Sequence, residues 1–346
     1  MQDSFGRTID YLRISVTEAC NFSCLYCAPN GHVAPQTAPL TVEEIEHVAR
    51  AAVALGVSKI RLTGGEPLLR RDIAEIVRAV ASIDGVNDLA LTTNGFGLAR
   101  LARDLADAGL DRVNISLDTL RRERFAQITG VRAISPTGES EFQSGMPTGE
   151  SARQDAFDQV WAGIHAAEDA GLAPVKINMV VLRGINDDEF VEFARLTLAH
   201  PWHVRFIELM PVGANDAARG LFNRHFISAD ELIARLPELE QSAAPRGNGP
   251  ARTYCLPGAE TTIGFITPAS EHFCNACNRI RVTARGAVCA CLFGESEVDL
   301  RRVLCENVNA HALQELLARA IGAKPEQHPS GDEYAIRVQA MSKIGG

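Results

Sequence analysis

The strongest constraint on the fold is a regular alternation of strand-like and helix-like segments between residues 8 and 210. Short runs rich in apolar and β-branched residues are separated by longer segments with the spacing of amphipathic helices. The predicted strands are YLRISV, KIRLT, LALTTN, RVNISLD, VKINMVV and VRFIEL. Six such units in series predict parallel strands with right-handed crossovers, either in a doubly wound sheet or in a complete or partial barrel.

The clearest helical segment spans residues 41–56. It begins with the pattern of a capping box, formed by Thr41 and Glu44, and Gly56 stands at its end. Further helices of the same kind are predicted at residues 72–83, 98–109, 187–199 and 229–236.

Residues with unusual chemistry follow the predicted strands. The segments TEAC, TGGEP, TTNG, SLD and ELM stand at the ends of five of them. Both candidate architectures place ligand sites at the carboxyl ends of parallel strands. One such segment alone would be an ordinary turn, whereas five on one face predict a functional site.

Two parts of the chain depart from this pattern. Residues 131–154 are rich in Gly, Ser, Pro and Glu and contain PTGES twice, which predicts a mobile surface loop. After residue 210 the alternation weakens, and residues 245–293 combine Gly and Pro with short β-like pieces. We therefore expect a core domain at residues 1–225 and a smaller C-terminal subdomain at residues 226–346.

Composition excludes some classes of function. The net charge of −9 argues against a protein that coats nucleic acid. No apolar run approaches the roughly 18–20 residues of a membrane span, and the N-terminal segment lacks the apolar region of a signal peptide. We expect a cytoplasmic protein without nucleic-acid or membrane partners, whose clustered cysteines stay reduced and bind metal.

The first cysteine cluster follows the first predicted strand. Cys20, Cys24 and Cys27 are separated by three and two residues. A structural zinc site would need a fourth ligand, for which His32 is the local candidate. An iron–sulfur cube held by three thiolates instead leaves one iron open, which a catalytic cluster requires.

The second cluster comprises Cys274, Cys277, Cys289 and Cys291. All four thiols have suitable spacing for a zinc knuckle, which the spacing alone favours. Alternatively, Cys274, Cys277 and Cys291 hold a second iron–sulfur cube that also has one open iron.

The motif C-x3-C-x2-C, with Tyr26 before its last cysteine, resembles the radical S-adenosylmethionine (SAM) superfamily. TGGEP at residues 63–67 fits this resemblance, since the family uses the glycine pair for close backbone approach to the methionine part of SAM. With C-x2-C-x13-C near its C-terminus, the chain resembles the two-cluster family that begins molybdenum cofactor biosynthesis. The matching stretches are LRISVTEACNFSCLYC, KIRLTGGEPLLRRD, LTTNG, NISLD, VKINMVVLRGINDDE, RFIELMPVG, CNRIRVT and the terminal SKIGG.

The resemblance implies a fold and a set of cofactors. The fold is an α/β partial (βα)6 TIM-like barrel with a smaller C-terminal iron–sulfur subdomain. The implied cofactors are SAM and two [4Fe-4S] clusters, whose ligands are Cys20, Cys24 and Cys27 for the first and Cys274, Cys277 and Cys291 for the second. The implied SAM-binding residues are Tyr26, Gly65, Ser116 and Met210. Cys289 is a departure from the family pattern that keeps the zinc alternative open.

The resemblance also implies GTP as the substrate. GTP carries about four negative charges, and the planar fork of arginine suits phosphate oxygens. The residues that match the family's GTP site are Arg13, Arg61, Thr92, Lys176, Arg279 and Arg281. Lys59 and Arg205 are weaker candidates, and Asn178 and Asp118 are polar groups at strand ends that could line the same pocket.

The implied reaction starts with reductive cleavage of SAM to a 5′-deoxyadenosyl radical, which removes the 3′ hydrogen of GTP. The C3′ radical then attacks C8, giving 3′,8-cyclo-7,8-dihydro-GTP after one further reduction, while the second cluster holds the guanine. Catalytic roles are implied for Arg279 and Arg281, and for Gly345 and Gly346, which resemble a tail that reaches back into the pocket.

The implied partners are an electron donor such as flavodoxin or ferredoxin, a downstream cyclic pyranopterin monophosphate synthase, and a second copy of the chain in a homodimer. Two alternatives remain at this point. One is another two-cluster radical SAM enzyme, for example one that modifies a peptide, and the other is a non-catalytic iron–sulfur or zinc scaffold.

Overall fold

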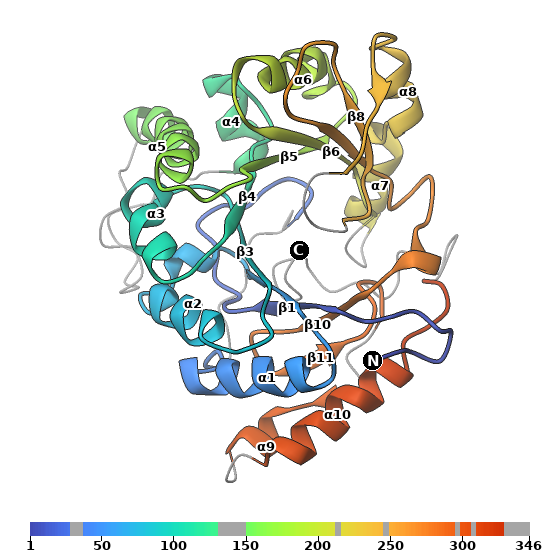
Figure 1. The fold of residues 1–346 in the computed structure, drawn as a ribbon. Coiled ribbons are helices and arrows are strands. Elements are labelled where there is room, and N and C mark those ends of the chain that lie inside the picture. Colours follow the sequence, from blue (N-terminus) through green and yellow to red (C-terminus); the bar gives the residue numbers. More distant parts are fainter. Residues whose placement is uncertain are drawn as a thin grey trace.

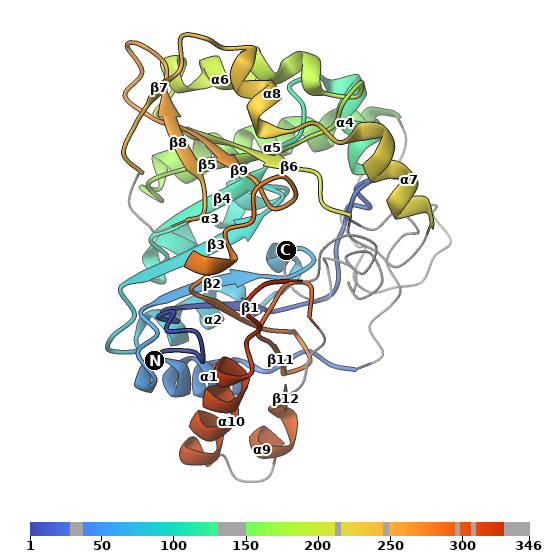
Figure 2. The ribbon, with the colours of Figure 1, turned by 90° about the vertical axis from the view of Figure 1, so that its right-hand side faces the viewer.

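The computed structural model describes residues 1–27, 37–130, 150–211, 216–244, 249–294, 298–305 and 309–328. Its strands form one sheet in the order β12-β11-β10-β1-β2-β3-β4-β5-β6-β9-β8-β7. The sheet curves around a central space, and helices cover its outer side (Figures 1 and 2). Within these residues no helix combines the length and apolar character that crossing a membrane requires.

The six predicted strands form the middle of the sheet and run parallel to one another in chain order. They are β1 (Tyr11–Ser15), β2 (Lys59–Thr63), β3 (Asp88–Thr93), β4 (Arg112–Ser116), β5 (Lys176–Val181) and β6 (His203–Glu208). This arrangement confirms the partial barrel that the sequence predicts.

Helical segments connect these strands, as the spacing of apolar residues predicts. They are α1 (Val42–Ala54), η1 (Pro67–Leu69), α2 (Ile73–Ala81), α3 (Leu98–Asp107), α4 (Arg122–Thr129), α5 (Glu150–Asp169), η2 (Asp187–Glu189) and α6 (Phe190–Ala199). The capping box of α1 is confirmed, because the Glu44 backbone N–H donates to the Thr41 hydroxyl (3.2 Å) and the Thr41 N–H donates to the Glu44 carboxylate (2.8 Å).

The start of α5 corrects one expectation. The surface loop predicted for residues 131–154 is wrong from Glu150 onward, where the helix begins. Residues 131–149 lie outside the described part of the chain.

Successive residues of each strand point to opposite sides of the sheet, and the two sides differ in chemistry. In β1, Leu12 and Ile14 are fully buried in the hydrophobic core between the sheet and the helices. Tyr11 and Arg13 point the other way and line the central space, as does Arg61 of β2. The core therefore lies outside the barrel wall, and the interior is left polar.

The C-terminal part of the chain joins this sheet at both edges. β9 (Ile263–Ile266) pairs in parallel with β6, and β10 (Arg279–Val282) pairs in parallel with β1. The remaining elements are α7 (Asp216–His225), α8 (Ala229–Ala234), β7 (Glu240–Gln241), β8 (Arg252–Cys255), η3 (Cys274–Ala276), β11 (Ala287–Cys289), β12 (Val298–Asp299), α9 (Arg301–Cys305) and α10 (Ala310–Gly322). α10 lies beside α1 on the outside of the sheet (Figures 1 and 2). The domain boundary near residue 225 stays a prediction.

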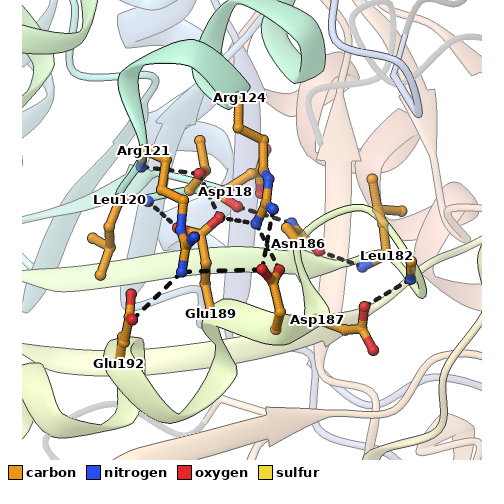
Figure 3. A network of polar contacts seen from close by, with 12 residues as sticks. Asp118, Leu120, Arg121, Arg124, Leu182, Asn186, Asp187, Glu189 and Glu192 are labelled. Atoms are coloured by element: carbon orange, nitrogen blue, oxygen red, sulfur yellow. Dashed lines mark hydrogen bonds and ion pairs between the residues drawn. The ribbon is translucent and has the colours of Figure 1, made fainter.

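A buried carboxylate fastens the loops that follow β4 and β5 (Figure 3). Glu189 is fully buried and accepts hydrogen bonds from the Thr119 hydroxyl (2.6 Å) and the Leu120 N–H (2.6 Å). Arg124 of α4 donates to the same carboxylate. The segment that carries Glu189 forms η2 and leads into α6, so GINDDE has the structural role of starting a helix, as the sequence indicates.

Asn186 makes a second link between the same loops (Figure 3). Its side-chain amide donates to the backbone carbonyls of Asp118 (2.8 Å) and Val180 (2.9 Å), and its oxygen accepts from the Leu182 N–H (2.7 Å). Because Asp118 faces the central space, this network determines where the polar groups at the ends of β4 and β5 stand.

We predict that Glu189→Gln destabilises the fold by about 1.5–3 kcal/mol, the usual value of hydrogen bonds to a charged group. The variant loses the carboxylate that pairs with Arg124. The NH2 group of the new amide would also face hydrogen-bond donors where a carboxylate oxygen had accepted from them. Glu192→Gln is the matched control, because that side chain is 56% exposed in the same network. Urea unfolding of both variants checks this, and equal midpoints would contradict the role of the buried carboxylate.

Candidate active site

A large cavity occupies the barrel interior. It is lined by side chains of β1 to β6, by β10 and by the two cysteine-bearing loops. The six cysteines predicted as cluster ligands all line it: Cys20, Cys24, Cys27, Cys274, Cys277 and Cys291. Two motifs that are far apart in the sequence, ending at Cys27 and beginning at Cys274, therefore face one space.

The two triads lie at opposite ends of the barrel. Cys20, Cys24 and Cys27 follow the carboxyl end of β1, whereas Cys274 and Cys277 precede the amino end of β10. β1 and β10 are adjacent and parallel. The alternating pattern predicts a site only at the carboxyl ends of the strands, and the structure places the second triad at their amino ends.

The first cysteine loop is held by neighbouring backbone groups. The Ser23 and Leu25 N–H groups donate to the Thr129 (2.8 Å) and Ile128 (3.0 Å) carbonyls at the end of α4. Burial, together with the nearby Glu66 carboxylate, raises the pKa of the Cys20 thiol to about 12. Thiolates at this position therefore need a compensating positive charge, which bound iron would supply.

The glycine pair of TGGEP allows this loop to lie against β2. The Gly65 N–H donates to the Thr17 carbonyl (2.7 Å), and the Glu66 N–H donates to the Ala19 carbonyl (2.7 Å). A Cβ atom on Gly65 would stand 2.3 Å from the Ala19 carbonyl oxygen. The contact with the cysteine loop thus demands glycine here, and the proposed approach to SAM stays a prediction.

The structure distinguishes the two neighbouring C-terminal cysteines. Cys291 lines the cavity, whereas Cys289 does not and packs in a small apolar cluster with Phe293. Burial alone would raise the pKa of Cys277, but Arg279 and Lys324 lower it to about 7. Of the four C-terminal cysteines, the three that match the family spacing are the ones that line the cavity.

Strand register brings the predicted cations into rows. Arg13 of β1 is opposite Arg281 of β10 on one side and Arg61 of β2 on the other. Tyr11 is likewise opposite Arg279 and Lys59. Because residues two apart in a strand share a face, both rows point into the cavity. The strands contribute three further inward cations, Arg112, Lys176 and Arg205.

Several buried polar atoms in the cavity have no hydrogen-bond partner in the part of the chain that the structure describes. They include the Nε atoms of Arg13, Arg61 and Arg205, one terminal nitrogen of Arg281, the Thr92 hydroxyl and the Asn178 side-chain oxygen. Buried polar groups in folded proteins are usually paired, so this set indicates a ligand with many hydrogen-bond acceptors.

The pKa values report the same excess of positive charge. Burial and neighbouring cations lower the pKa of Arg205 and of Arg281 to about 9 and that of Lys176 to about 7. Burial would raise the pKa of Tyr11, yet Arg61 and Arg13 lower it to about 8. An anion is the ligand that relieves this repulsion.

The residues predicted to bind SAM also line the cavity, near the carboxyl ends of the strands: Tyr26, Gly65, Ser116 and Met210. The Tyr26 hydroxyl donates to the Asp118 carboxylate (2.7 Å), which also accepts from the Val180 N–H (2.8 Å). Burial raises the pKa of Asp118 to about 6. Asp118 thus fixes Tyr26 to the barrel wall.

Some lining residues were not identified from the sequence. Tyr11 lies two residues before Arg13 in the same strand and therefore on the same face, so it could have been found from Arg13. Arg112 lines the cavity while donating to Asp88 with Nε (2.8 Å) and a terminal nitrogen (2.6 Å), a buried pair that no local pattern shows. Lys324 reaches the second triad from beyond α10. His32, Gly345 and Gly346 lie outside the described residues.

Two family models match the chain. The model described as the radical SAM superfamily matches residues 14–197. The model described as Molybdenum Cofactor Synthesis C matches residues 202–330.

Curated relatives match over the full length. Proteins named GTP 3′,8-cyclase are 46% identical in Pelotomaculum thermopropionicum, 44% in Heliobacterium modesticaldum and 42% in Moorella thermoacetica, each covering 100% of both chains. Among solved structures, Streptococcus suis SuiB bound to S-adenosylmethionine superposes with a TM-score of 0.53 at 14% identity. The match covers 89% of this chain and 68% of SuiB and shows a shared fold.

We predict that Gly65→Ala destabilises the protein by about 1–3 kcal/mol, because the new methyl group overpacks against the Ala19 carbonyl. Displacement of the loop should also reduce the iron that the first triad retains after anaerobic reconstitution. Gly249→Ala is the matched control, since Gly249 also lines the cavity but its Cβ would meet no atom within 4 Å. Unfolding midpoints and iron content measure both effects, and wild-type values for Gly65→Ala would contradict the prediction.

Proposed function

The chain belongs to the radical SAM superfamily and, within it, to the GTP 3′,8-cyclases, and we propose that its cavity holds SAM and GTP between two iron–sulfur clusters. Its reaction is the conversion of GTP to 3′,8-cyclo-7,8-dihydro-GTP, the first step of molybdenum cofactor biosynthesis. The observation that carries the proposal is that one cavity joins two cysteine triads with several buried arginines, each of which has a nitrogen without a hydrogen-bond partner among the described residues.

Both triads suit a four-iron cluster with one open iron. Each supplies three sulfurs from one or two loops and faces the cavity, where a ligand could reach the uncovered corner. Cys20, Cys24 and Cys27 would hold the cluster that binds SAM, and Cys274, Cys277 and Cys291 the cluster that binds guanine. The first cluster and SAM together supply the one-electron chemistry that starts the reaction.

The chain's own residues bind and orient the substrate. Arg13, Arg61 and Arg281 form one row across three strands, so their nitrogens present a continuous set of donors to a triphosphate. Thr92 of β3 and Lys176 of β5 extend this set along the sheet. We assign these residues, together with Arg279, to GTP.

Arg279 and Arg281 have the closest link to the second cluster. They alternate on β10, which begins two residues after Cys277, so a short segment carries a cluster ligand and two phosphate donors. This continuity would fix the guanine and the triphosphate of one GTP molecule relative to each other, which holds C8 near C3′ for ring closure.

SAM occupies the other end of the cavity in this proposal. Tyr26, Gly65, Ser116 and Met210 stand near the first triad at the carboxyl ends of the strands, whereas the arginine rows lie deeper in the barrel. The ribose of GTP would then lie between the two groups of residues. Surrounding walls exclude water and protect the reacting carbon from other hydrogen donors.

Further parts of the proposal rest on the family alone. They are a flavodoxin or ferredoxin as electron donor, a cyclic pyranopterin monophosphate synthase as the downstream enzyme, a homodimer, a cytoplasmic location and a catalytic role for Gly345 and Gly346.

A pair of cysteine variants tests the two-cluster arrangement. The reconstituted wild-type chain should bind about eight iron atoms as two four-iron clusters, and should form the cyclised nucleotide from GTP with SAM and a reductant. Cys291→Ser should lose the second cluster and the product. Cys289→Ser, the matched control, should keep both, because Cys289 does not face the cavity. Mössbauer spectra measure the clusters, and a second site occupied by one zinc ion would contradict the proposal.

Binding of GTP should draw a proton into the cavity. The pKa of Lys176 is about 7 in the ligand-free protein, so at about pH 8.5 most of this side chain is neutral. A triphosphate favours the ammonium form and raises that pKa, so affinity should fall as the pH rises above about 7.

Isothermal titration calorimetry in buffers of different ionisation enthalpy measures this proton uptake. Lys176→Arg is the matched variant, because arginine stays charged and should bind GTP with less uptake. Equal uptake by Lys176→Arg and the wild-type chain would contradict the assignment to Lys176.

A further inference from the structure

A buried lysine from beyond α10 stands against the second cysteine triad. Lys324 follows the last residue of α10, Gly322, by two positions, and it is only 4% exposed. Its side chain lines the cavity together with Cys277 and Cys291. The residues assigned to GTP and to SAM do not include Lys324, so its buried charge needs its own explanation.

The contacts of Lys324 link the peptides beside two of the cysteines. Its Nζ atom donates to the carbonyl of Arg279 (2.9 Å) and to the carbonyl of Ala290 (2.6 Å). Its third hydrogen-bonding contact is the side chain of Cys277. Ala290 directly precedes Cys291, and Arg279 is two residues after Cys277. An ammonium group has three donors, so all of them are used here.

A second cation ties the third cysteine to the same segment. The Arg7 guanidinium donates to the carbonyl of Cys274 (2.8 Å) and to the carbonyls of Pro325 (2.7 Å) and Glu326 (2.8 Å). Asp3 holds Arg7 in place by accepting from its Nε atom (2.6 Å). Residues 324–326 therefore brace all three cysteine-bearing segments of the second triad.

We propose that Lys324 is a positioning residue of the second cluster, which fixes Cys277 and Cys291 and raises the reduction potential of the cluster they hold. This inference rests on the proposed function. A positive charge and a hydrogen bond at a ligating sulfur stabilise the reduced cluster, which carries the additional negative charge. Hydrogen bonds from Lys324 to backbone carbonyls alone would not raise the reduction potential of the second cluster. This potential therefore separates the proposed role from a merely structural one.

The test is a redox titration of the reconstituted full-length enzyme, followed by electron paramagnetic resonance. The variants are Lys324→Met, which removes charge and donors, Lys324→Gln, which keeps donors, and Lys324→Arg, which keeps the charge. Arg319→Met is the matched control, because it removes an exposed cation from the last turn of α10. Signals are assigned by adding SAM, which perturbs only the cluster that binds it.

We expect a more negative potential of the second cluster in Lys324→Met and Lys324→Gln, partial restoration in Lys324→Arg, and no change in Arg319→Met. The first cluster should keep its potential in all four. Unchanged potentials in Lys324→Met and Lys324→Gln, with both clusters assembled, would overturn the inference. If the second cluster is lost in Lys324→Met and also in Lys324→Arg, the inference is overturned. If Lys324→Met loses the cluster and Lys324→Arg keeps it, the result supports a positioning role for the charge. Failure of the proposed function has a different signature, which is a wild-type chain without a second cluster.

Discussion

The parallel pairing of β10 with β1 is the constraint on which the rest of the site depends. It places a strand from the C-terminal part of the chain beside the first strand of the barrel, with Arg281 opposite Arg13. Cys274 and Cys277 precede β10, Cys291 follows β11 and the first triad follows β1, so this pairing puts the two triads at opposite ends of one cavity. The Asn278 side chain donates to Asp10 (2.6 Å) and the Tyr11 N–H donates to the Asn278 carbonyl (3.3 Å), which secures the start of the pairing.

The cavity contains buried arginines whose missing hydrogen bonds and mutual repulsion lower the stability of the ligand-free protein. The arginine nitrogens of the cavity are buried and in part unpartnered, and their neighbours are other cations. Unpaired buried donors each cost about 1–3 kcal/mol, and the apolar core between the sheet and the helices has to offset that cost. The proposed polyanionic nucleotide would relieve both the missing hydrogen bonds and the repulsion. In this proposal, the groups that give specificity for the anion are the same groups that weaken the ligand-free fold.

The sequence predicts the parts that are governed by local patterns. All six central strands follow from the periodicity of apolar residues, and the capping box of α1 follows from its residue pattern. The inward cations and the choice of Cys274, Cys277 and Cys291 came from the resemblance to a known family. Long-range pairing is not local: the four-residue strands β9 and β10 carry no signal of their partners, so their place at both edges of the barrel was not foreseen. The same limit hides Lys324 and Arg7, whose role arises from carbonyls far away in the chain. The family spacing selects Cys291 over Cys289, and the structure agrees in placing Cys291 and not Cys289 at the cavity.

The central claim is that SAM and GTP share one cavity, with the reacting ribose of GTP between the first triad and the arginine rows. The most direct measurement uses GTP labelled with deuterium at C3′, incubated under anaerobic conditions with SAM, a reductant and the reconstituted enzyme. Mass spectrometry of the 5′-deoxyadenosine released in that turnover reports where its new hydrogen came from. The account predicts one deuterium in that product, whereas unlabelled 5′-deoxyadenosine formed alongside the cyclised nucleotide would contradict it.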